Sequence, residues 1–308
     1  MIMKEISLRA HAKINLSLEI TGRRDNGYHD IDSVMQGVSL FDIISVCDKA
    51  DGCYVATRRG VRMHLKSEAE GMPYDESNLA IKGLASAIDA TADRHEGELP
   101  SDVCVEIIKK LPVAAGIAGG SGNAACAMLG FNAITGSHLS LAELVELGVS
   151  VGADVPFSIT MNACRNKQSL EGLEGIEDAM DAARARGIGE VLERTVPVRR
   201  YVILANPGIA VSTREVYEAI DSEEREDNFA LFFNRMEEYT LKNYSEARQL
   251  KELMEDLLDA DEVLMSGSGP TIAAYFKEEA ERDRGFEILC ESMRERWRAW
   301  KCMTGEEL

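Results

Sequence analysis

Hydrophobic and polar residues alternate along the first part of the chain. Four aliphatic residues there occupy every second position: Ile14, Leu16, Leu18 and Ile20. This is the period of a strand with one buried face, so we expect a strand over 6–20. The polar stretch 21–28 interrupts it, because its Asn-Gly pair favours a tight turn. Two further strands are predicted over 34–46 and 53–65, which makes the start of the chain rich in β structure.

Helical spacing follows. Apolar side chains in 77–93 recur at intervals of three and four residues, and Ser77 or Asn78 can cap this helix. A strand rich in β-branched residues is expected over 102–108. The pattern after it predicts two helices, over 124–134 and 140–148, the second with a serine and a glutamate at the spacing of a capping box.

The second half begins with a polar stretch, 162–189. Its pattern predicts a helical part at 176–185, a strand at 200–205, helices at 212–220 and 244–258, strands at 263–265 and 271–276, and a closing helix at 279–300. Strands and helices mix without regular βαβ alternation, which favours an α+β fold over a doubly wound sheet.

The length of 308 residues suggests two domains. We place the predicted boundary near residue 160, where the composition changes from apolar to polar. The first domain is then 1–160. The second is 161–308 and includes a polar insert at about 161–189.

Charge narrows the classes of partner. The chain has 34 Lys and Arg against 53 Asp and Glu, a net charge of −19, whereas nucleic-acid and anionic-membrane surfaces need clustered positive charge. We therefore expect no nucleic-acid and no membrane partner; the oligomeric state is not indicated. The seven cysteines lack CxxC or zinc-ligand spacing and are typical of free thiols in a reducing compartment. With no apolar run typical of a signal peptide or membrane span, we expect a cytoplasmic protein.

The segment LPVAAGIAGGSGNAA (111–125) concentrates four glycines and five alanines before a predicted helix. Glycine permits close backbone approach, so successive N–H groups and the helix start can surround an anion such as phosphate. A tight turn that needs glycine only for geometry is the alternative. The segment lacks the P-loop lysine. Its match to GxGxxA does not follow a strand end directly, which makes a dinucleotide oxidoreductase a distant alternative.

Three other features suggest chemistry. A second glycine loop, Ser266–Pro270, could complete a nucleotide cradle or be a plain turn. Asp154, in GADVPF, is either a turn residue or a carboxylate that accepts a proton from a hydroxyl. Lys13 lies within a strand pattern, where an inward lysine needs an acid or an anion and an outward one is solvated. Tyr28 and His29 could stack on a base or be ordinary surface residues.

Five segments in this order resemble the GHMP kinases. They are AKINLSLEITGRRDNGYH (12–29), LPVAAGIAGGSGNAA (111–125), VGADVPF (151–157), NPGIAVSTREVY (206–217) and MSGSGPT (265–271). The resemblance implies a first domain like the second domain of ribosomal protein S5, an α+β second domain, and an active site between them. The AKINL, GYH and GADVPF motifs are most similar to the branch that phosphorylates a cytidine diphosphate-linked alcohol of the non-mevalonate isoprenoid pathway.

The resemblance also implies roles for residues. Asp154 is the catalytic base and Lys13 orients it with the hydroxyl, while Asn15, Tyr28 and His29 bind the substrate. ATP, accompanied by Mg²⁺ near the Ser121 hydroxyl, is the implied cofactor. The implied ATP site consists of Pro112, Val113, Ala114, Ala115, Gly116, Ile117, Ala118, Gly119, Gly120, Ser121, Gly122, Asn123, Gly267, Ser268 and Gly269.

Two departures from the family pattern leave alternatives open. The family loop usually reads GLGGGSSNAA, so Ala118 replaces a glycine and Gly122 a serine. The segment 158–186 is longer and more polar than is usual. The alternatives are a GHMP kinase for another small alcohol, homoserine-like or mevalonate-like, and a nucleotide-binding homologue without activity.

Overall fold

The protein is described by a computed structural model over residues 4–50, 52–94, 99–113, 115–221 and 227–305. Its first part contains β1 (Glu5–Arg23), β2 (His29–Cys47), β3 (Ala56–Arg58), β4 (Val61–Lys66), α1 (Leu79–Asp93), β5 (Asp102–Ile108), α2 (Gly119–Thr135), α3 (Leu141–Val151) and α4 (Val155–Arg165). Next come the short 3₁₀ helix η1 (Ile176–Asp178), β6 (Ala182–Gly187) and β7 (Val191–Arg194). The last part contains β8 (Arg200–Asn206), α5 (Thr213–Ile220), β9 (Phe233–Asn234), α6 (Glu237–Asn243), α7 (Ser245–Leu257), β10 (Glu262–Met265), β11 (Ile272–Phe276), α8 (Glu279–Ser292) and β12 (Arg298–Thr304).

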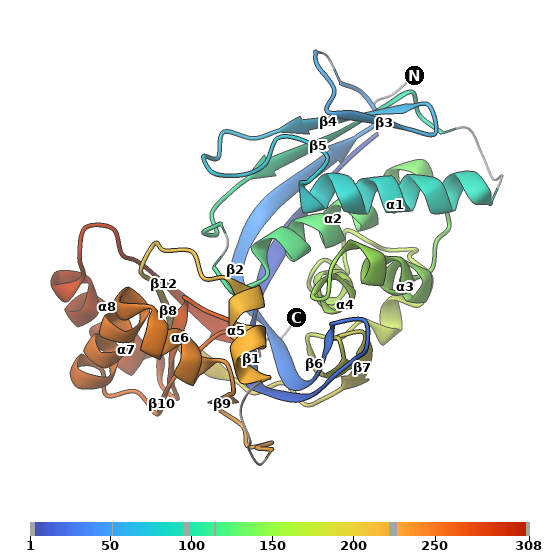
Figure 1. Cartoon of the computed structure of the whole chain (residues 1–308). Coiled ribbons are helices and arrows are strands. Elements are labelled where there is room, and N and C mark those ends of the chain that lie inside the picture. Colours follow the sequence, from blue (N-terminus) through green and yellow to red (C-terminus); the bar gives the residue numbers. More distant parts are fainter. Residues whose placement is uncertain (1–3, 51, 95–98, 114, 222–226, 306–308) are drawn as a thin grey trace.

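The long antiparallel pair β1 and β2 organises the molecule. Pairing runs from Glu5 opposite Cys47 to Arg23 opposite His29. The predicted turn joins the two strands, with Gly27 at φ 87°, a value that glycine adopts without strain. Both strands curve from the upper to the lower part of the molecule in Figure 1. They therefore connect the two halves of the molecule through one continuous pair of strands.

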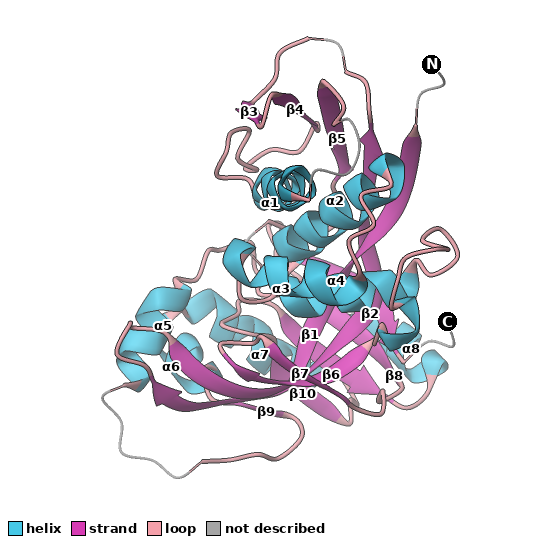
Figure 2. Ribbon diagram, turned by 90° about the vertical axis from the view of Figure 1, so that its right-hand side faces the viewer, coloured by secondary structure: helices cyan, strands magenta, loops and turns pink. Residues whose placement is uncertain are grey.

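The described strands form one mixed sheet. Its main path is β10-β11-β8-β12-β2-β5-β4-β3, and β1, β6, β7 and β9 branch from it. The C-terminal strands join the rest of the sheet in the middle of this path, where Thr304 of β12 pairs with Val38 of β2. In the first part α1, α2 and α4 pack against strands, and α3 packs on these helices. In the last part α7 and α8 pack against the C-terminal strands, and α6 packs on α5 and α7 (Figure 2). The predicted α+β class is confirmed.

Several local predictions are confirmed. Asn78 caps α1 by accepting a hydrogen bond from the amide of Ala80 at 2.9 Å. Ser140 and Glu143 form the predicted capping box of α3. The strand predicted over 53–65 is a hairpin of β3 and β4, since Arg59 and Gly60 both have positive φ and reverse the chain. No helix in the part of the chain that the structure describes is both long and apolar enough to span a bilayer.

The helix predicted at 176–185 is wrong. Only the 3₁₀ turn η1 forms there, and β6 follows it. Alanine and arginine favour helices, but here they pair with β2, so that Ala183 and Ala185 are buried while Arg184 binds Asp32 at 2.7 Å. Tertiary pairing thus overrides local propensity. The short strand β7, which extends this hairpin, was not predicted.

The closing helix predicted over 279–300 is also wrong in its last part. Helix α8 ends at Ser292, and β12 follows it. The segment is rich in charge and reads as helix, yet it pairs along its whole length with β8. In the other direction, the helix predicted over 124–134 begins earlier, at Gly119, within the glycine-rich segment. Helix α4 was not predicted, and its start at Val155 places Asp154 at a helix N-terminus.

Candidate active site

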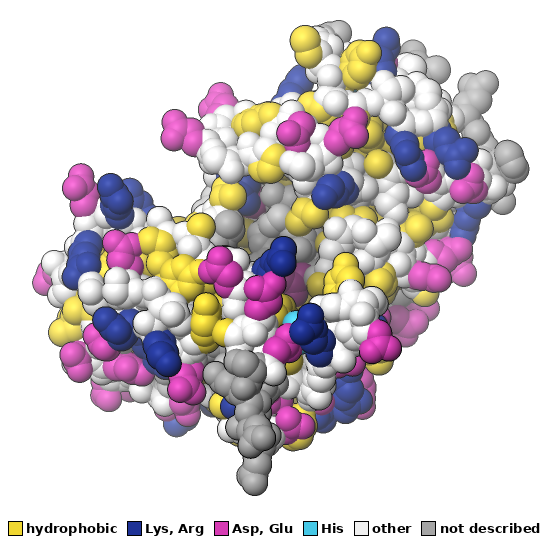
Figure 3. Space-filling model, viewed as in Figure 1, with side chains coloured by type: hydrophobic (Ala, Val, Ile, Leu, Met, Phe, Trp, Pro, Cys, Tyr) yellow, Lys and Arg dark blue, Asp and Glu magenta, His cyan; other side chains and the backbone are white. Residues whose placement is uncertain are grey.

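A cavity of about 520 Å³ lies between the two halves of the molecule, on the face that is hollowed in Figure 3. Twelve of the residues predicted for the site line it: Lys13, Asn15, Ala115, Gly116, Ala118, Gly119, Gly120, Ser121, Asp154, Gly267, Ser268 and Gly269. They come from β1, both glycine loops and the start of α4. Segments far apart in the sequence therefore meet in one place.

The charged pair of the cavity is Lys13 and Asp154. Lys13 Nζ lies 3.1 Å from Asp154 Oδ1, and the lysine side chain is 4% exposed. Lys13 Nζ also donates to Asn15 Oδ1 at 2.9 Å. Asn15 in turn donates to the Ser33 hydroxyl at 2.8 Å, which donates to the carbonyl of Ser17. This chain of hydrogen bonds holds the inward-facing lysine in one orientation, and the alternative of a solvated lysine is excluded.

Asp154 is more open than its partner. Its side chain is 35% exposed and it precedes α4, whose first turn contains Pro156. A carboxylate at this position often caps its own helix, but the Asp154 side chain makes no such bond and turns to Lys13 instead. One carboxylate oxygen is thus held by an ammonium group, while the rest of the group faces the cavity. Such a carboxylate can accept a proton from a hydroxyl.

The first glycine loop runs directly into α2. Ala118 stands before the helix with φ 55°, and no side chain caps the helix N-terminus. The first intrahelical bond runs from Gly122 N to Ala118 O at 2.9 Å. The amides before it, of Gly119, Gly120 and Ser121, therefore face the cavity side without helical carbonyl partners. Amides of this kind, together with the helix dipole, form a site for phosphate.

The two glycine loops pack on each other. The Ser266 hydroxyl donates to the carbonyl of Gly116 at 3.1 Å. A Cβ on Gly116 would lie 2.7 Å from the carbonyl oxygens of Ser266 and Gly269, so only glycine fits there. Asn234 supports the second loop, donating its amide to the carbonyls of Met265 and Gly267 at 2.8 Å each. The loops thus form one backbone-lined wall.

A buried aspartate fixes the strand that leads into the first loop. Asp42 Oδ1 accepts from the amides of Lys110 and Leu111 at 2.7 and 2.9 Å, and Oδ2 accepts from Lys109 Nζ at 2.5 Å. In the amide orientation that satisfies both of its neighbours, Asn123 also donates to Oδ2 at 3.0 Å. Asp42 is fully buried. Its carboxylate is therefore saturated by donors and anchors the loop.

A smaller hollow of about 180 Å³ adjoins the cavity, because the two share Leu79 and Gly120. Lys109 and three more residues of the predicted ATP site border it: Pro112, Val113 and Asn123. Its exposed lining is largely apolar. A flat apolar group next to the phosphate-binding amides fits this arrangement.

Neither Tyr28 nor His29 is among the residues that line the cavity, and His29 is connected to it through its contact with Tyr217. Tyr28 is 57% exposed. The His29 ring stacks on Tyr217, with ring centroids 4.4 Å apart, and His29 Nε2 lies 2.7 Å from Asp221 Oδ1. Tyr217 lines the cavity. Burial and then the negative charge of Asp154 raise the pKa of Tyr217 above its usual value, so its hydroxyl stays protonated.

Other predicted residues lie beside the cavity. Ile117 is buried in the core and its carbonyl accepts from the amide of Lys13 at 3.1 Å. Gly122 packs so closely on β1 that a Cβ would lie 2.9 Å from the carbonyl of His11, which explains why serine is absent here. Ala114 lies outside the described residues.

Sequence reasoning missed part of the lining. These residues are Leu18, Ile31, Met35, Leu79, Ala153, Ile188, Val211, Thr213, Tyr217 and Met236. Thr213 binds the Ser268 hydroxyl at 2.7 Å and so links α5 to the second glycine loop. The motif NPGIAVSTREVY contains both Thr213 and Tyr217, and that motif was the only signal that could have identified them.

Two family matches cover the chain in succession. Residues 78–162 match the N-terminal domain of the GHMP kinases and residues 207–295 match the GHMP kinase C-terminal domain. A relative from Alkaliphilus metalliredigens is 33% identical over 306 residues, with 93% of each chain covered. One from Exiguobacterium sibiricum is 35% identical over 91% of this chain and 92% of its own. Both relatives are named 4-diphosphocytidyl-2-C-methyl-D-erythritol kinase.

Solved structures share the fold. A 4-(cytidine 5'-diphospho)-2C-methyl-D-erythritol kinase superposes with a TM-score of 0.73 at 24% identity, over 98% of this chain and 100% of that one. A homoserine kinase from Cytophaga hutchinsonii superposes with a TM-score of 0.60 at 12% identity, over 98% and 95%. At these identities the likeness concerns the fold, and the predicted two-domain architecture is confirmed.

Proposed function

The chain belongs to the GHMP kinase family, and we propose that it transfers the γ-phosphoryl group of ATP to the 2-hydroxyl of 4-diphosphocytidyl-2-C-methyl-D-erythritol. The observation that carries the proposal is the Lys13–Asp154 pair, 3.1 Å apart, in one cavity with the uncapped N-terminus of α2. The names of the relatives at 33–35% identity support the choice of acceptor.

ATP fits the two adjoining hollows. In this proposal the adenine occupies the smaller hollow between Leu79, Pro112 and Val113, and the triphosphate follows the glycine loop into the larger cavity. The amides of Gly119 to Ser121 then hold the phosphate charge that grows during transfer. Preorganised amides cost no reorganisation during the reaction, so electrostatic stabilisation carries much of the rate.

The chain's own groups perform the proton transfer. The Asp154 carboxylate accepts the proton of the 2-hydroxyl while that oxygen bonds to the γ-phosphorus and the bond to the bridging oxygen of ADP breaks. Lys13 lies within reach of both the carboxylate and the incoming hydroxyl oxygen, and its positive charge keeps the two oxygens together. Positioning of this kind accounts for much of phosphoryl-transfer catalysis.

Mg²⁺ is part of the proposal. No cluster of three or more His, Cys, Asp or Glu side chains that could hold a metal occurs among the residues that the structure describes. Mg²⁺ in kinase sites needs less, since one or two protein oxygens, substrate phosphates and water suffice. The Ser121 hydroxyl, which lines the cavity, would hold it together with phosphate oxygens. When bound it neutralises phosphate charge.

The aromatic edge of the cavity suits the cytosine of the acceptor. Tyr217 offers a ring face that His29 already stacks upon, and Tyr28 lies next to His29 in the turn with its ring exposed. A cytosine inserted among these rings would gain stacking, with the imidazole as a hydrogen-bonding group. Asn15, bound to Lys13, then lies near the reacting hydroxyl.

Two features of the protein's setting belong to the proposal as well. Free thiols, among them Cys47, Cys53 and Cys126, suit a reducing compartment and support a cytoplasmic location. The domain boundary near residue 160, with an insert at about 161–189, is kept as a proposal. Residue 160 lies within α4 and the insert contains β6, and both elements contact the β1–β2 pair.

The test is ADP release from ATP and Mg²⁺ with different acceptors. We expect release with 4-diphosphocytidyl-2-C-methyl-D-erythritol and only background release with homoserine or mevalonate. Protection by CDP against proteolysis is the matched binding control. Release with one of the other alcohols and no protection by CDP would transfer the proposal to that alcohol. ATP binding without release on any acceptor would show a nucleotide-binding homologue.

A further inference from the structure

The ladder between β1 and β2 is irregular just before the catalytic lysine. His11 lies opposite Phe41, whereas Lys13 lies opposite Gly37, so three residues of β2 face one residue of β1 at this bulge. Bulges bend a strand and redirect side chains, and they are frequent beside active sites. Here the bulge immediately precedes the residue whose side chain enters the cavity. Some backbone groups of β2 near it need partners from outside the ladder.

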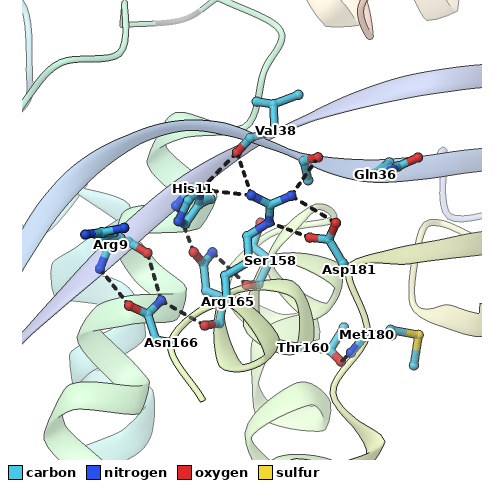
Figure 4. A network of polar contacts seen from close by, with 12 residues as sticks. Arg9, His11, Gln36, Val38, Ser158, Thr160, Arg165, Asn166, Met180 and Asp181 are labelled. Atoms are coloured by element: carbon cyan, nitrogen blue, oxygen red, sulfur yellow. Dashed lines mark hydrogen bonds and ion pairs between the residues drawn. The ribbon is translucent and has the colours of Figure 1, made fainter. Parts of the chain in front are cut away.

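Arg165, the last residue of α4, supplies those partners. Its Nη1 donates to the carbonyl of Val38 at 3.2 Å and its Nη2 to the carbonyl of Gly37 at 3.1 Å. Its Nε and Nη2 bind the two carboxylate oxygens of Asp181 at 2.5 and 2.9 Å. The amide of Gly37 donates to the backbone carbonyl of Asp181 at 3.0 Å. Figure 4 shows the guanidinium between the Val38 carbonyl, the His11 ring and Asp181.

The fit at the bulge is close. The Arg165 side chain is fully buried and that of Asp181 is 6% exposed. A Cβ on Gly37 would lie 2.5 Å from Asp181 Oδ1 and 2.7 Å from Arg165 Nε. His11 Nδ1 also binds the carbonyl of Val38 at 2.9 Å. Burial, followed by the charge of Arg165, lowers the pKa of His11 to about 3, so the imidazole stays neutral and adds no second charge.

The same helix is joined to β1 by two asparagines. Asn162 Oδ1 accepts from the amide of His11 at 2.8 Å. Asn166 accepts from the amide of Arg9 and donates to its carbonyl, both at 2.9 Å, as a neighbouring strand would. Helix α4 is thus bonded to β1 at its C-terminal end, while Asp154 stands at its N-terminal end. The strand carries Lys13 and the helix carries Asp154.

We propose that Arg165, held by Asp181, is a positioning residue for phosphoryl transfer: it fixes the β-bulge and the end of α4 so that Lys13 and Asp154 meet in the cavity. This inference rests on the proposed function and extends it to the polar segment. Arg165 is not among the residues that line the cavity, and the contacts described above connect it to β2 and α4, through which it acts. An error of about 1 Å in such a pair can cost as much as 10²-fold in rate.

The variant Arg165→Lys tests this role, since it keeps the charge but cannot bind two carbonyls and a carboxylate at once. We expect kcat to fall roughly 10-fold or more while the KM for ATP changes little, because the lost contacts affect the reacting pair and not the nucleotide loops. Arg282→Lys is the matched control. Arg282 is also buried and also binds a backbone carbonyl, that of Cys302 at 3.0 Å, and two carboxylates, but it lies outside the cavity.

The double variant Arg165→Gln/Asp181→Asn leaves no unpaired buried charge, and it keeps the test usable where the single variant folds poorly. A second readout does not depend on kinase activity. Competitive acetylation, read by mass spectrometry, should label Lys13 faster in the Arg165 variants, with Lys109 as the internal reference. Wild-type kcat and wild-type labelling of Lys13 in a folded Arg165 variant would overturn the inference. Faster labelling in a chain that phosphorylates no acceptor would reject the proposed function and uphold the positioning role.

Discussion

Two lysine–aspartate pairs of this protein consist of the same residue types but have different roles. Lys109 and Asp42 are shielded from water, and every donor around Asp42 is directed at its two oxygens. Lys13 and Asp154 are joined by one contact, with the Asp154 side chain 35% exposed at the cavity. A saturated carboxylate can only hold structure. An open one, held on one side, can receive a substrate hydroxyl, so the difference separates anchoring from chemistry.

The largest expected effect breaks the anchoring pair. Asp42→Asn leaves Lys109 with its charge uncompensated in a buried place, so the free energy of unfolding should fall by about 3–5 kcal/mol. Urea unfolding measures it. Asp154→Asn is the matched control: it also leaves a buried lysine without its acid, but the Asp154 side chain is 35% exposed and water can reach the pair, so the same measurement should show a smaller loss than Asp42→Asn does. Equal losses in both variants would remove the distinction between the pairs.

Acid should weaken the buried cluster around His11. The pKa of His11 is about 3 in the folded chain, against 6.5 for an ordinary histidine. Between these values the unfolded chain binds a proton that the folded chain does not, so the stability that this histidine supplies is present above pH 6.5 and is lost as the pH falls toward 3. The expected loss is on the order of a few kcal/mol.

Urea unfolding of the wild type at pH 7 and pH 4.5 measures this loss of stability. His11→Asn, which can still donate to the Val38 carbonyl, should show a smaller difference between the two pH values. If the wild type and this variant lose the same stability on acidification, the acid sensitivity lies elsewhere.

The smallest expected effect on the free energy of unfolding concerns the first glycine loop. Ala118 has φ 55°, which is costly for a residue with a Cβ. Ala118→Gly should raise the free energy of unfolding by about 0.5–1 kcal/mol, the relief of strain outweighing the entropy of the added glycine. Ala124→Gly, at a buried position inside α2, should lower it, because glycine weakens a helix interior. A loss of stability in both variants would show that Ala118 is not strained.

The pairs also show what could be read from the sequence. Lys13 and Asp154 lie in motifs of the GHMP kinases. Both glycine loops are rich in a residue that permits positive φ and close backbone approach. The caps of α1 and α3 follow from local chemistry, which sequence patterns report well. Each of those predictions rests on a short motif or on local chemistry, so a short stretch of sequence is enough to make it.

Asp42 and Arg165 could not be found in this way. Asp42 lies within a strand pattern, and its partners are 67 to 69 residues away. Arg165 lies in a polar stretch that resembles a solvated insert. Its role follows from its contacts with the bulge in β2, which the sequence pattern does not show. The strand β6 was mistaken for a helix because its partner strand, and not its own residues, determines its conformation. Long-range pairing was the information that the sequence pattern lacked.

The most direct test is a single-turnover measurement of phosphoryl transfer from γ-labelled ATP to 4-diphosphocytidyl-2-C-methyl-D-erythritol, with wild type and Asp154→Asn compared at equal ATP occupancy. We predict labelled acceptor with the wild type, and transfer slower by roughly 10²-fold or more with Asp154→Asn while ATP binding is unchanged. Transfer at the wild-type rate by Asp154→Asn, or no labelled acceptor with the wild type, would contradict the account.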